Sequence, residues 1–246
     1  MTPFWIALQF LTRLPCPNVA YDDATQLGRS ALYYPLVGAV MGVILIACGW
    51  VLEQFTAPPA LIAAGLLTLW VMLSGALHLD GLGDSADAWM GGGQDRQRCL
   101  SIMQDPCAGT AAVVSIALLL LMKFVALEYL LTQATSFWAL LLVPVLARSA
   151  VLTLLLSTPS ARADGLGARL AQHLPRGPGI AVILGTVLLV TLVWPLHGGL
   201  LLLTALVVTL LLRRMMLRRL GGTTGDTCGA LIEINEAVLL AMLCLF

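Results

Sequence analysis

Charged side chains are scarce in this sequence. Its 246 residues include thirteen Lys and Arg and thirteen Asp and Glu, together 11% of the chain, whereas an ordinary soluble domain carries about 25%. The formal net charge of zero removes any bulk electrostatic case for nucleic-acid binding. Because 59% of the residues are apolar and the mean hydropathy is +0.94, the composition excludes a disordered or ordinary water-soluble protein and indicates a membrane protein.

Several sequence motifs are also missing. The six cysteines include no C-x-x-C pair, so packing explains them better than a zinc or disulfide framework does. No H-E-x-x-H or G-x-x-x-x-G-K-[ST] string occurs, which argues against a zinc protease and against an NTP-hydrolysing P-loop. The N-terminal segment lacks a basic n-region and an A-x-A cleavage site, so we expect it to stay on the mature protein.

Long apolar runs are what the chain has in abundance. Each is near the roughly 20 residues that cross a bilayer. Phe4, Leu8 and Leu11 precede the first run with the spacing of one helical face, as in an interfacial helix. No repeat or linker divides the chain, so we predict an all-α fold. We expect a single polytopic membrane domain over 1–246, built as a bundle of about seven transmembrane helices plus short interfacial helices. The predicted spans are 31–52, 59–77, 111–131, 135–156, 179–196, 198–212 and 230–246.

The basic residues predict how this bundle is oriented. The first six spans form three hairpins, whose tips at 56–58, 132–134 and 196–197 hold no Lys or Arg. Eleven of the thirteen basic residues lie on the opposite side, which the positive-inside rule makes cytoplasmic. Three polar segments converge on that cytoplasmic side, where one active site can draw on all of them: 78–110, 157–178 and 213–229.

The segment 78–89 contains three aspartates, which are the strongest indication of a functional site in the sequence. On a helix, Asp80, Asp84 and Asp87 point within roughly 60° of one another, and their mutual repulsion near a membrane makes unpaired carboxylates costly. A divalent cation would relieve this repulsion, and oxygen ligands suit Mg²⁺, with Mn²⁺ as a substitute. His78 lies about 160° from Asp80 on the same helix, which speaks against zinc. The alternative is a solvated helix start favoured by the helix dipole.

A glycine- and threonine-rich segment, 220–229, follows four arginines. Glycine lets backbone N–H groups approach an anion, while hydroxyls and guanidinium groups donate hydrogen bonds, so we predict a phosphate-binding loop. Asp226 and Glu233 are seven residues apart and would add carboxylates to the metal site if the segment is helical. A glycine-rich turn whose arginines serve only topology is the alternative. The predicted phosphate-binding residues are Thr223, Thr224, Gly225, Thr227, Arg218 and Arg219.

Two cations interrupt the apolar spans. They are Lys123, the only lysine in the chain, and Arg148. Intramembrane cations are costly and mark functional sites by default, so we predict that both bind an anionic group of the substrate. A structural ion pair with Glu128 is the alternative. In the preceding loop, Asp105 and Pro106 indicate the start of the third spanning helix.

Metal-binding carboxylates, phosphate donors and an apolar bundle together predict phosphoryl-group transfer on a membrane-associated substrate. The cation would neutralise a diphosphate, and a carboxylate would take a proton from the attacking hydroxyl. Two other classes compete: the string 81–84 matches the short G-x-G-D of intramembrane aspartyl proteases, and a transporter would use the intramembrane charges. We expect the catalytic residues to be Asp84, Asp87 and His78, and the metal ligands to be Asp80, Asp84, Asp87, Asp226 and Glu233.

The sequence also resembles a known family from near residue 4 to its end. The resemblance is to cobalamin synthases, the adenosylcobinamide-GDP ribazoletransferases. It implies a multi-pass enzyme of the bacterial inner membrane that uses Mg²⁺, joins adenosylcobinamide-GDP to α-ribazole or its 5'-phosphate, and releases GMP. It implies no nucleic-acid partner, and it is compatible with membrane lipid as a partner and with an oligomer. The strings that carry it are QFLTRLPCP (9–17), YYPLVGAVMG (33–42), GALHLDGLGDSADAW (75–89), ADGLG (163–167) and LGGTTGDTCGA (220–230).

The resemblance assigns residues as well, and it has one departure. The segment 105–110 reads D-P-C-A-G-T where the family usually has D-S-R-x-G-T, so an arginine from another loop would have to replace the missing one. The runner-up family, the CDP-alcohol phosphotransferases, needs D-G-x-x-A-R, and Leu-Gly-Asp-Ser follows Asp80–Gly81 instead. Two motifs of the family match residues of this chain. His78, Asp80, Asp84 and Asp87 match its HLDGLxD-type motif, and Thr224, Gly225, Asp226 and Thr227 match its TGDT motif. Lys123 and Arg148 also match family positions.

Overall fold

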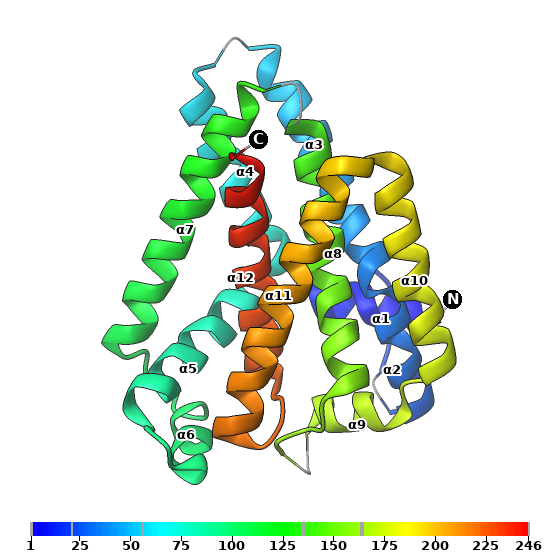
Figure 1. Ribbon diagram of the computed structural model, residues 1–246, viewed down its shortest axis with the longest axis vertical. Coiled ribbons are helices and arrows are strands. Elements are labelled where there is room, and N and C mark those ends of the chain that lie inside the picture. The colour runs from blue at the N-terminus through cyan, green and yellow to red at the C-terminus, as the bar shows by residue number, and fades with distance from the viewer. Residues whose placement is uncertain (1, 21, 56, 134–135, 163–164, 246) are drawn as a thin grey trace.

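The computed structural model describes residues 2–20, 22–55, 57–133, 136–162 and 165–245. Within these ranges the chain is helical and forms no named β-strand, which confirms the predicted all-α fold. Figure 1 shows the helices side by side in one bundle. In chain order they are α1 (Thr2–Leu11), α2 (Ala24–Ser30), the 3₁₀ turn η1 (Ala31–Tyr33), α3 (Tyr34–Glu53), α4 (Pro59–Ser74), α5 (Leu77–Gly91), α6 (Arg96–Ile102), α7 (Thr110–Leu131), α8 (Ser136–Ser157), α9 (Leu166–His173), α10 (Arg176–Val193), α11 (Pro195–Leu220) and α12 (Gly225–Leu243).

The described helices include five that are long and apolar enough to cross a membrane, or six if the bent pair α4 and α5 counts as one span. The five are the continuous helix from α2 through α3, then α7, α8, α10 and α11. The seventh expected span falls in α12, which carries Asp226, Glu233 and Glu236 and whose apolar side chains are mostly buried. The total of seven therefore stays a prediction.

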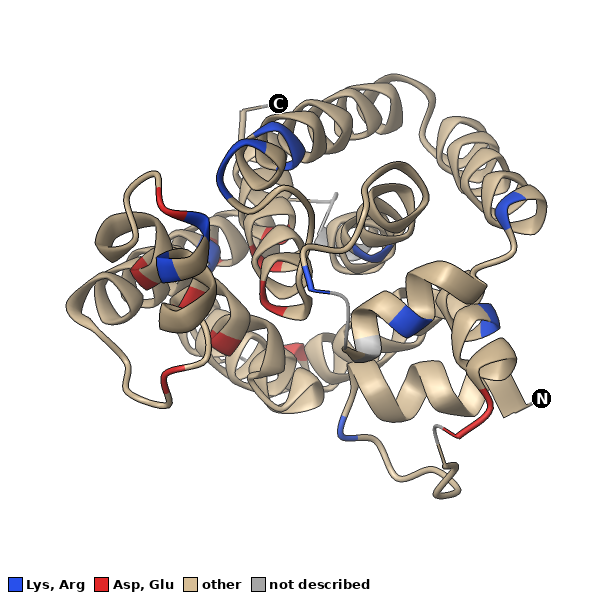
Figure 2. Cartoon of the chain, turned by 90° about the horizontal axis from the view of Figure 1, so that it is seen from below, with Lys and Arg blue, Asp and Glu red and all other residues tan. Residues whose placement is uncertain are grey.

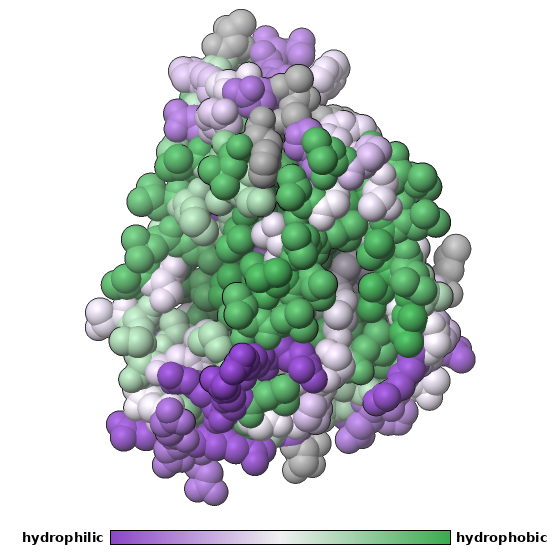
Figure 3. Space-filling model, viewed as in Figure 1, coloured by the Kyte–Doolittle hydropathy of each residue, from purple (hydrophilic) through white to green (hydrophobic). Residues whose placement is uncertain are grey.

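The outside of the bundle is apolar and its lower end is polar. Large apolar side chains are exposed on the outer helices, as with Leu118 of α7 at 62% and Leu192 of α10 at 72%. Figure 3 shows this belt in green above a band of hydrophilic residues at the lower end. An exposed apolar surface of this extent is typical of a protein solvated by lipid, and it agrees with the multi-pass membrane character predicted from composition.

α12 lies at the centre of the bundle and contacts α5, α7, α8 and α11. Backbones approach closely where small residues meet. A Cβ placed on Gly38 of α3 would lie 2.5 Å from the carbonyl oxygen of Pro144 in α8, and one on Gly42 would lie 2.8 Å from that of Leu140. Glycine at these two positions lets α3 and α8 pack face to face, as small residues do between membrane helices.

A sharp turn separates α4 from α5. The predicted span 59–77 ends at Ser74, and Gly75 (φ +61°) and Ala76 (φ +58°) turn the chain into the left-handed region. The two helices are bent by 85°, so α5 lies across the polar end of the bundle. Left-handed backbone costs little at glycine but is unfavourable at alanine, which shows that this turn is imposed by packing on both sides.

Segments predicted as loops are largely helical. The range 78–110 contains most of α5 and all of α6, and the predicted span 198–212 extends to Leu220, so all four arginines at 213–219 lie on α11. The interfacial helix predicted around Phe4 is α1, with Leu8 and Leu11 buried. Figure 2, which views the lower end, shows acidic positions of neighbouring helices close to one another and arginines around them.

Candidate active site

A close contact at the polar end joins α5 to the start of α12. A Cβ on Gly81 would lie 2.6 Å from the carbonyl oxygen of Asp226, and one on Gly229 would lie 3.1 Å from the Cα of His78. The helices can meet here only because both positions lack a side chain. The contact brings the aspartates of α5 beside Asp226, although the two segments are more than a hundred residues apart in the sequence.

Gly81→Ala tests this contact. The added methyl meets backbone atoms, which cannot rotate away, so we expect α5 and α12 to separate, with a loss of about 1–3 kcal/mol of stability. Displacement of the aspartates should lower kcat/KM by about 10–100-fold. Thermal unfolding in detergent and steady-state kinetics measure the two effects. Gly185→Ala in α10 is the control, because nothing lies within 4 Å of its added methyl; equal behaviour of the two variants would contradict the argument.

A cavity of about 300 Å³ opens beside this contact. Its lining comes from all three polar segments that the sequence predicted to converge: Asp80 from the first, Arg162 from the second and Asp226 from the third. Residues of all three segments therefore meet at this cavity. Further lining residues are apolar and come from the helices α1, α3 and α8: Phe10, Leu11, Tyr34, Val151 and Leu155.

The carboxylates at this end repel one another. α5 and the first turn of α12 lie at the polar end, outside the apolar spans. Burial, followed by the carboxylates of Asp80, Asp226 and Asp87, raises the pKa of Asp84 to about 6. Burial also raises the pKa of Asp226, although Arg162 Nη2 lies 3.6 Å from its carboxylate and opposes the shift. Excess negative charge therefore collects between the two helices, as the aspartate stripe predicted.

The five carboxylates predicted as metal ligands do not form one set. Asp87 accepts hydrogen bonds from the backbone N–H groups of Gly109 (2.6 Å) and Ala112 (3.0 Å), so it caps the N-terminus of α7. This is the helix start that the sequence assigned to Asp105 and Pro106; Asp105 instead accepts a hydrogen bond from Cys107 N–H. Glu233 binds Lys123. Within the described ranges, no group of three or more His, Cys, Asp or Glu residues is arranged to hold a metal ion.

Asp80, Asp84 and Asp226 remain as a donor set suited to Mg²⁺. Magnesium uses one or two carboxylates and fills its other positions with water and substrate phosphate oxygens, so a protein need not supply a complete cage. Burial and, after it, the neighbouring carboxylates raise the pKa of Asp84, and a hard cation would offset the repulsion between these carboxylates. These residues therefore fit the predicted ion, with Asp87 and Glu233 removed from the set for the reasons above.

The threonines of the phosphate loop have structural partners. Thr224 is the N-cap of α12 and forms a capping box with Thr227, whose hydroxyl accepts the Thr224 N–H at 2.8 Å. Thr227 is fully buried, which corrects its prediction as a phosphate ligand. Thr223 and Thr224 still line the cavity, as does the exposed Gly225 at the first position of the helix. Backbone hydrogen bonds of Thr223 to Pro159 (2.9 Å) and Ala161 (2.8 Å) hold the loop in place.

The arginine at the cavity was not among the predicted phosphate-binding residues. Arg219 donates to the carbonyl oxygens of Trp89 (2.7 Å) and Gly93 (3.0 Å) and so ties α11 to α5. Arg218 is exposed and does not line the cavity. Arg162 does line it, beside Asp226. Its position directly before the ADGLG string was the available signal. That Arg162 replaces the arginine missing from 105–110 stays a prediction.

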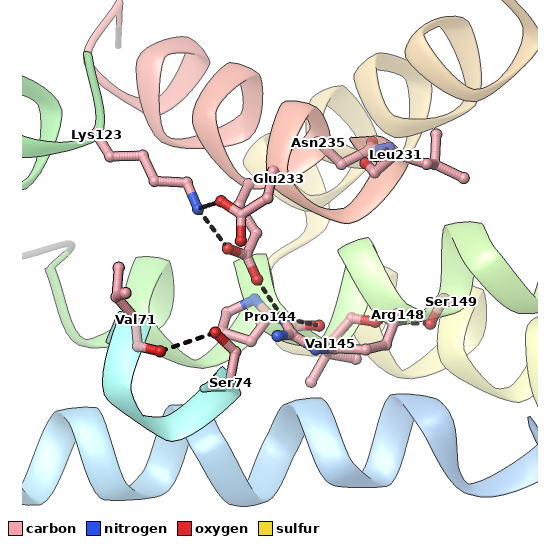
Figure 4. Close-up of polar contacts among 11 residues, drawn as sticks. Val71, Ser74, Lys123, Pro144, Val145, Arg148, Ser149, Leu231, Glu233 and Asn235 are labelled. Atoms are coloured by element: carbon pink, nitrogen blue, oxygen red, sulfur yellow. Dashed lines mark hydrogen bonds and ion pairs between the residues drawn. The ribbon is translucent and has the colours of Figure 1, made fainter. Parts of the chain in front are cut away.

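Lys123 and Arg148 are buried in an ion-pair network and do not lie at the phosphate loop. Lys123 Nζ lies 2.6 Å from carboxylate oxygens of both Glu233 and Glu236, and Arg148 pairs with the other oxygen of Glu236. Figure 4 shows Lys123 of α7 and Arg148 of α8 on two sides of α12. Both side chains are at most 2% exposed and contact carboxylates of α12, and their binding to an anionic group of the substrate stays a prediction. The alternative of a structural ion pair is therefore observed, but the partners are Glu233 and Glu236 instead of Glu128.

His78 lies between this network and the cavity. It is 3% exposed, lines the cavity, and neither of its ring nitrogens has a hydrogen-bond partner in the described part of the chain. Two nitrogens of Arg148 are likewise buried without partners there. Buried polar groups of this kind are costly unless water or a ligand satisfies them. The position of His78 is compatible with its predicted role, which stays a prediction.

Comparison with known proteins agrees with the resemblance seen in the sequence. The family model for cobalamin-5-phosphate synthase matches residues 3–244. The chain belongs to the cobalamin-5-phosphate synthase family. It is 52% identical to the adenosylcobinamide-GDP ribazoletransferase of Pseudomonas syringae pv. syringae (strain B728a), over all of both chains. It is 51% identical to that of Pseudomonas entomophila (strain L48), over 100% of this chain and 99% of the relative.

Family membership confirms the resemblance and establishes that this cobalamin synthase family member is an enzyme. No solved structure matches the chain.

Proposed function

We propose that this chain joins adenosylcobinamide-GDP to α-ribazole, or to its 5'-phosphate, and releases GMP in a Mg²⁺-dependent reaction. The product is adenosylcobalamin or its 5'-phosphate. The observation that carries the proposal is the cavity at which three segments meet, with Asp80, Asp226 and Arg162 in its lining. The names and full-length similarity of the relatives supply the substrates.

The reaction is a displacement at phosphorus. A ribose hydroxyl oxygen of α-ribazole forms a bond to the phosphorus that carries the corrinoid, and the bond from that phosphorus to the bridging oxygen breaks. GMP leaves with the bridging oxygen and its electron pair. The hydroxyl proton passes to a carboxylate, for which Asp80 and Asp226 are placed because both line the cavity. Atoms and charge balance without an oxidant or reductant.

Several residues around the cavity would each bind part of the diphosphate. Arg162 supplies a forked donor, and the N–H of Gly225 lies at the N-terminus of α12, where anions are favoured. Mg²⁺, held by Asp80, Asp84 and Asp226, would neutralise charge on the diphosphate and on the leaving group when bound. Mn²⁺ would substitute, since it prefers the same oxygen ligands.

We also propose that the polar end faces the cytoplasm and that the apolar belt lies in the inner membrane. The arginines at the C-terminal end of α11 and in the segments 96–98 and 162–176 support this orientation through the positive-inside rule. Bilayer lipid would then contact the exposed side chains of α7 and α10.

GMP release by the purified protein tests the proposal. The detergent-solubilised chain is given adenosylcobinamide-GDP and α-ribazole, with Mg²⁺ and then with EDTA, and nucleotide and corrinoid products are quantified. We expect GMP and a cobamide in equal amounts with Mg²⁺, at least 100-fold less with EDTA, and recovery when Mg²⁺ is returned. A folded, metal-replete sample that makes no GMP would overturn the proposal; CDP release with a phospholipid product would indicate the runner-up transferase.

A further inference from the structure

The apolar part of the cavity lining contains an aromatic pair that the chemistry above leaves without a role. Phe10 of α1 and Tyr34 of α3 stack with ring centroids 6.5 Å apart and planes at 21°. Tyr34 is 2% exposed and belongs, like Val151 and Leu155 of α8, to a buried apolar cluster. All four side chains line the cavity, so we name them the apolar wall. Packing on several helices keeps this wall in a fixed shape.

The volume of the cavity restricts what can occupy it. About 300 Å³ lies at the lower end of the range of about 300–1,000 Å³ that small-molecule sites span. This space suits one nucleoside and is too small for a corrinoid macrocycle with its nucleotide. Of the two substrates of the proposed function, only α-ribazole matches the whole cavity.

The chemistry of the lining distinguishes the two bases present in the reaction. The benzimidazole of α-ribazole is flat and largely apolar, with a single acceptor nitrogen on its edge, so its ring faces can stack on an aromatic pair and contact aliphatic side chains. The donors and acceptors of guanine would be buried against Phe10, Val151 and Leu155, whose side chains offer no hydrogen bonds, at a substantial cost. Polar side chains of the lining outside the apolar wall suit a ribose and a phosphate; they include His78, Asp80, Ser160, Arg162, Thr223, Thr224 and Asp226.

We infer that the apolar wall is the binding site for the base of α-ribazole, with its ribose directed to Asp80 and Asp226 and the corrinoid held outside the cavity. This inference rests on the proposed function and adds the location of one substrate to it. It makes Phe10 and Leu155 determinants of nucleoside affinity. The attacking hydroxyl is thereby placed beside the carboxylates that would accept its proton.

Phe10→Ala and Leu155→Asn test the inference through the two Michaelis constants. We expect each variant to raise the KM for α-ribazole about tenfold, a loss in line with an aromatic or apolar contact, while the KM for adenosylcobinamide-GDP stays within twofold. Phe124→Ala is the matched control, because Phe124 is partly buried in α7 and does not line the cavity. Thermal unfolding confirms that each variant is folded. A rise only in the KM for adenosylcobinamide-GDP would overturn the inference, as would no change in either constant.

A second measurement needs no variant to be active. We expect 5,6-dimethylbenzimidazole to inhibit the unaltered enzyme competitively against α-ribazole but not against adenosylcobinamide-GDP. Calorimetric titration with α-ribazole should show binding to the unaltered protein and at least tenfold weaker binding to Phe10→Ala. If the unaltered protein releases no GMP, the proposed function fails while the titration still decides the subsite. Equal binding by the unaltered protein and Phe10→Ala would exclude the apolar wall.

Discussion

Asp226→Asn is expected to lower kcat by about 100–1,000-fold while the protein still inserts and folds, a loss typical of removing one charged group from a transition-state site. The amide has the size of the carboxylate but cannot neutralise a cation or accept a proton. Asp226 lines the cavity, lies beside Arg162 and contributes to the crowding that raises the pKa of Asp84. Its loss therefore removes a proposed metal ligand and leaves Arg162 without its carboxylate.

GMP release at saturating substrate over a range of Mg²⁺ concentrations measures this effect. Asp105→Asn is the control, since Asp105 is exposed at the same end and an amide oxygen can still accept the hydrogen bond from Cys107 N–H. We expect the control to keep its activity within twofold. Near-normal rates for Asp226→Asn at every Mg²⁺ concentration would show that Asp226 has no role in the reaction. The same result for Asp80→Asn and Asp84→Asn as well would contradict the proposed metal site.

Glu236→Gln is expected to cost about 3–5 kcal/mol of stability, the amount typical of breaking a buried ion pair on one side. Glu236 is fully buried and binds Lys123 through one oxygen and Arg148 through the other. The intact network holds two cations and two carboxylates, so its charges cancel. The substitution leaves two buried cations facing Glu233 alone, inside a region that cannot hydrate the excess charge.

Unfolding in detergent by heat or denaturant measures this loss. Glu128→Gln on α7 is the control, because Glu128 is only partly buried and forms no ion pair in the described part of the chain; we expect a change within about 0.5 kcal/mol. The double variant Glu236→Gln with Lys123→Met restores the charge balance and should recover part of the stability. If Glu236→Gln matched the control, the network would contribute nothing measurable to the fold.

Properties that depend on local sequence were predictable. Hydropathy and run length indicated an all-α membrane protein, and the segment 78–89 was correctly assigned to a helix with three aspartates on it. The distribution of Arg residues predicted that three polar segments lie on one side of the bundle, and residues of all three line the cavity. The long motifs around His78 and Thr224 identified the family, because a match of that length does not depend on knowing which residues touch.

Partners distant in sequence were not predictable. Lys123 lies five residues from Glu128 but binds Glu236, which is 113 residues away, and Asp87 caps a helix that begins 23 residues later. Sequence periodicity reports which face of a helix a residue occupies, but not which helix packs against that face. The packing of α12 against α7 and of α5 against α7 decides those pairings. The sequence alone determined the class of fold, the family and the chemical types of residue at the site. The tertiary structure determined which carboxylates line the cavity and which form helix caps and ion pairs, because helix packing sets distances that no local pattern encodes.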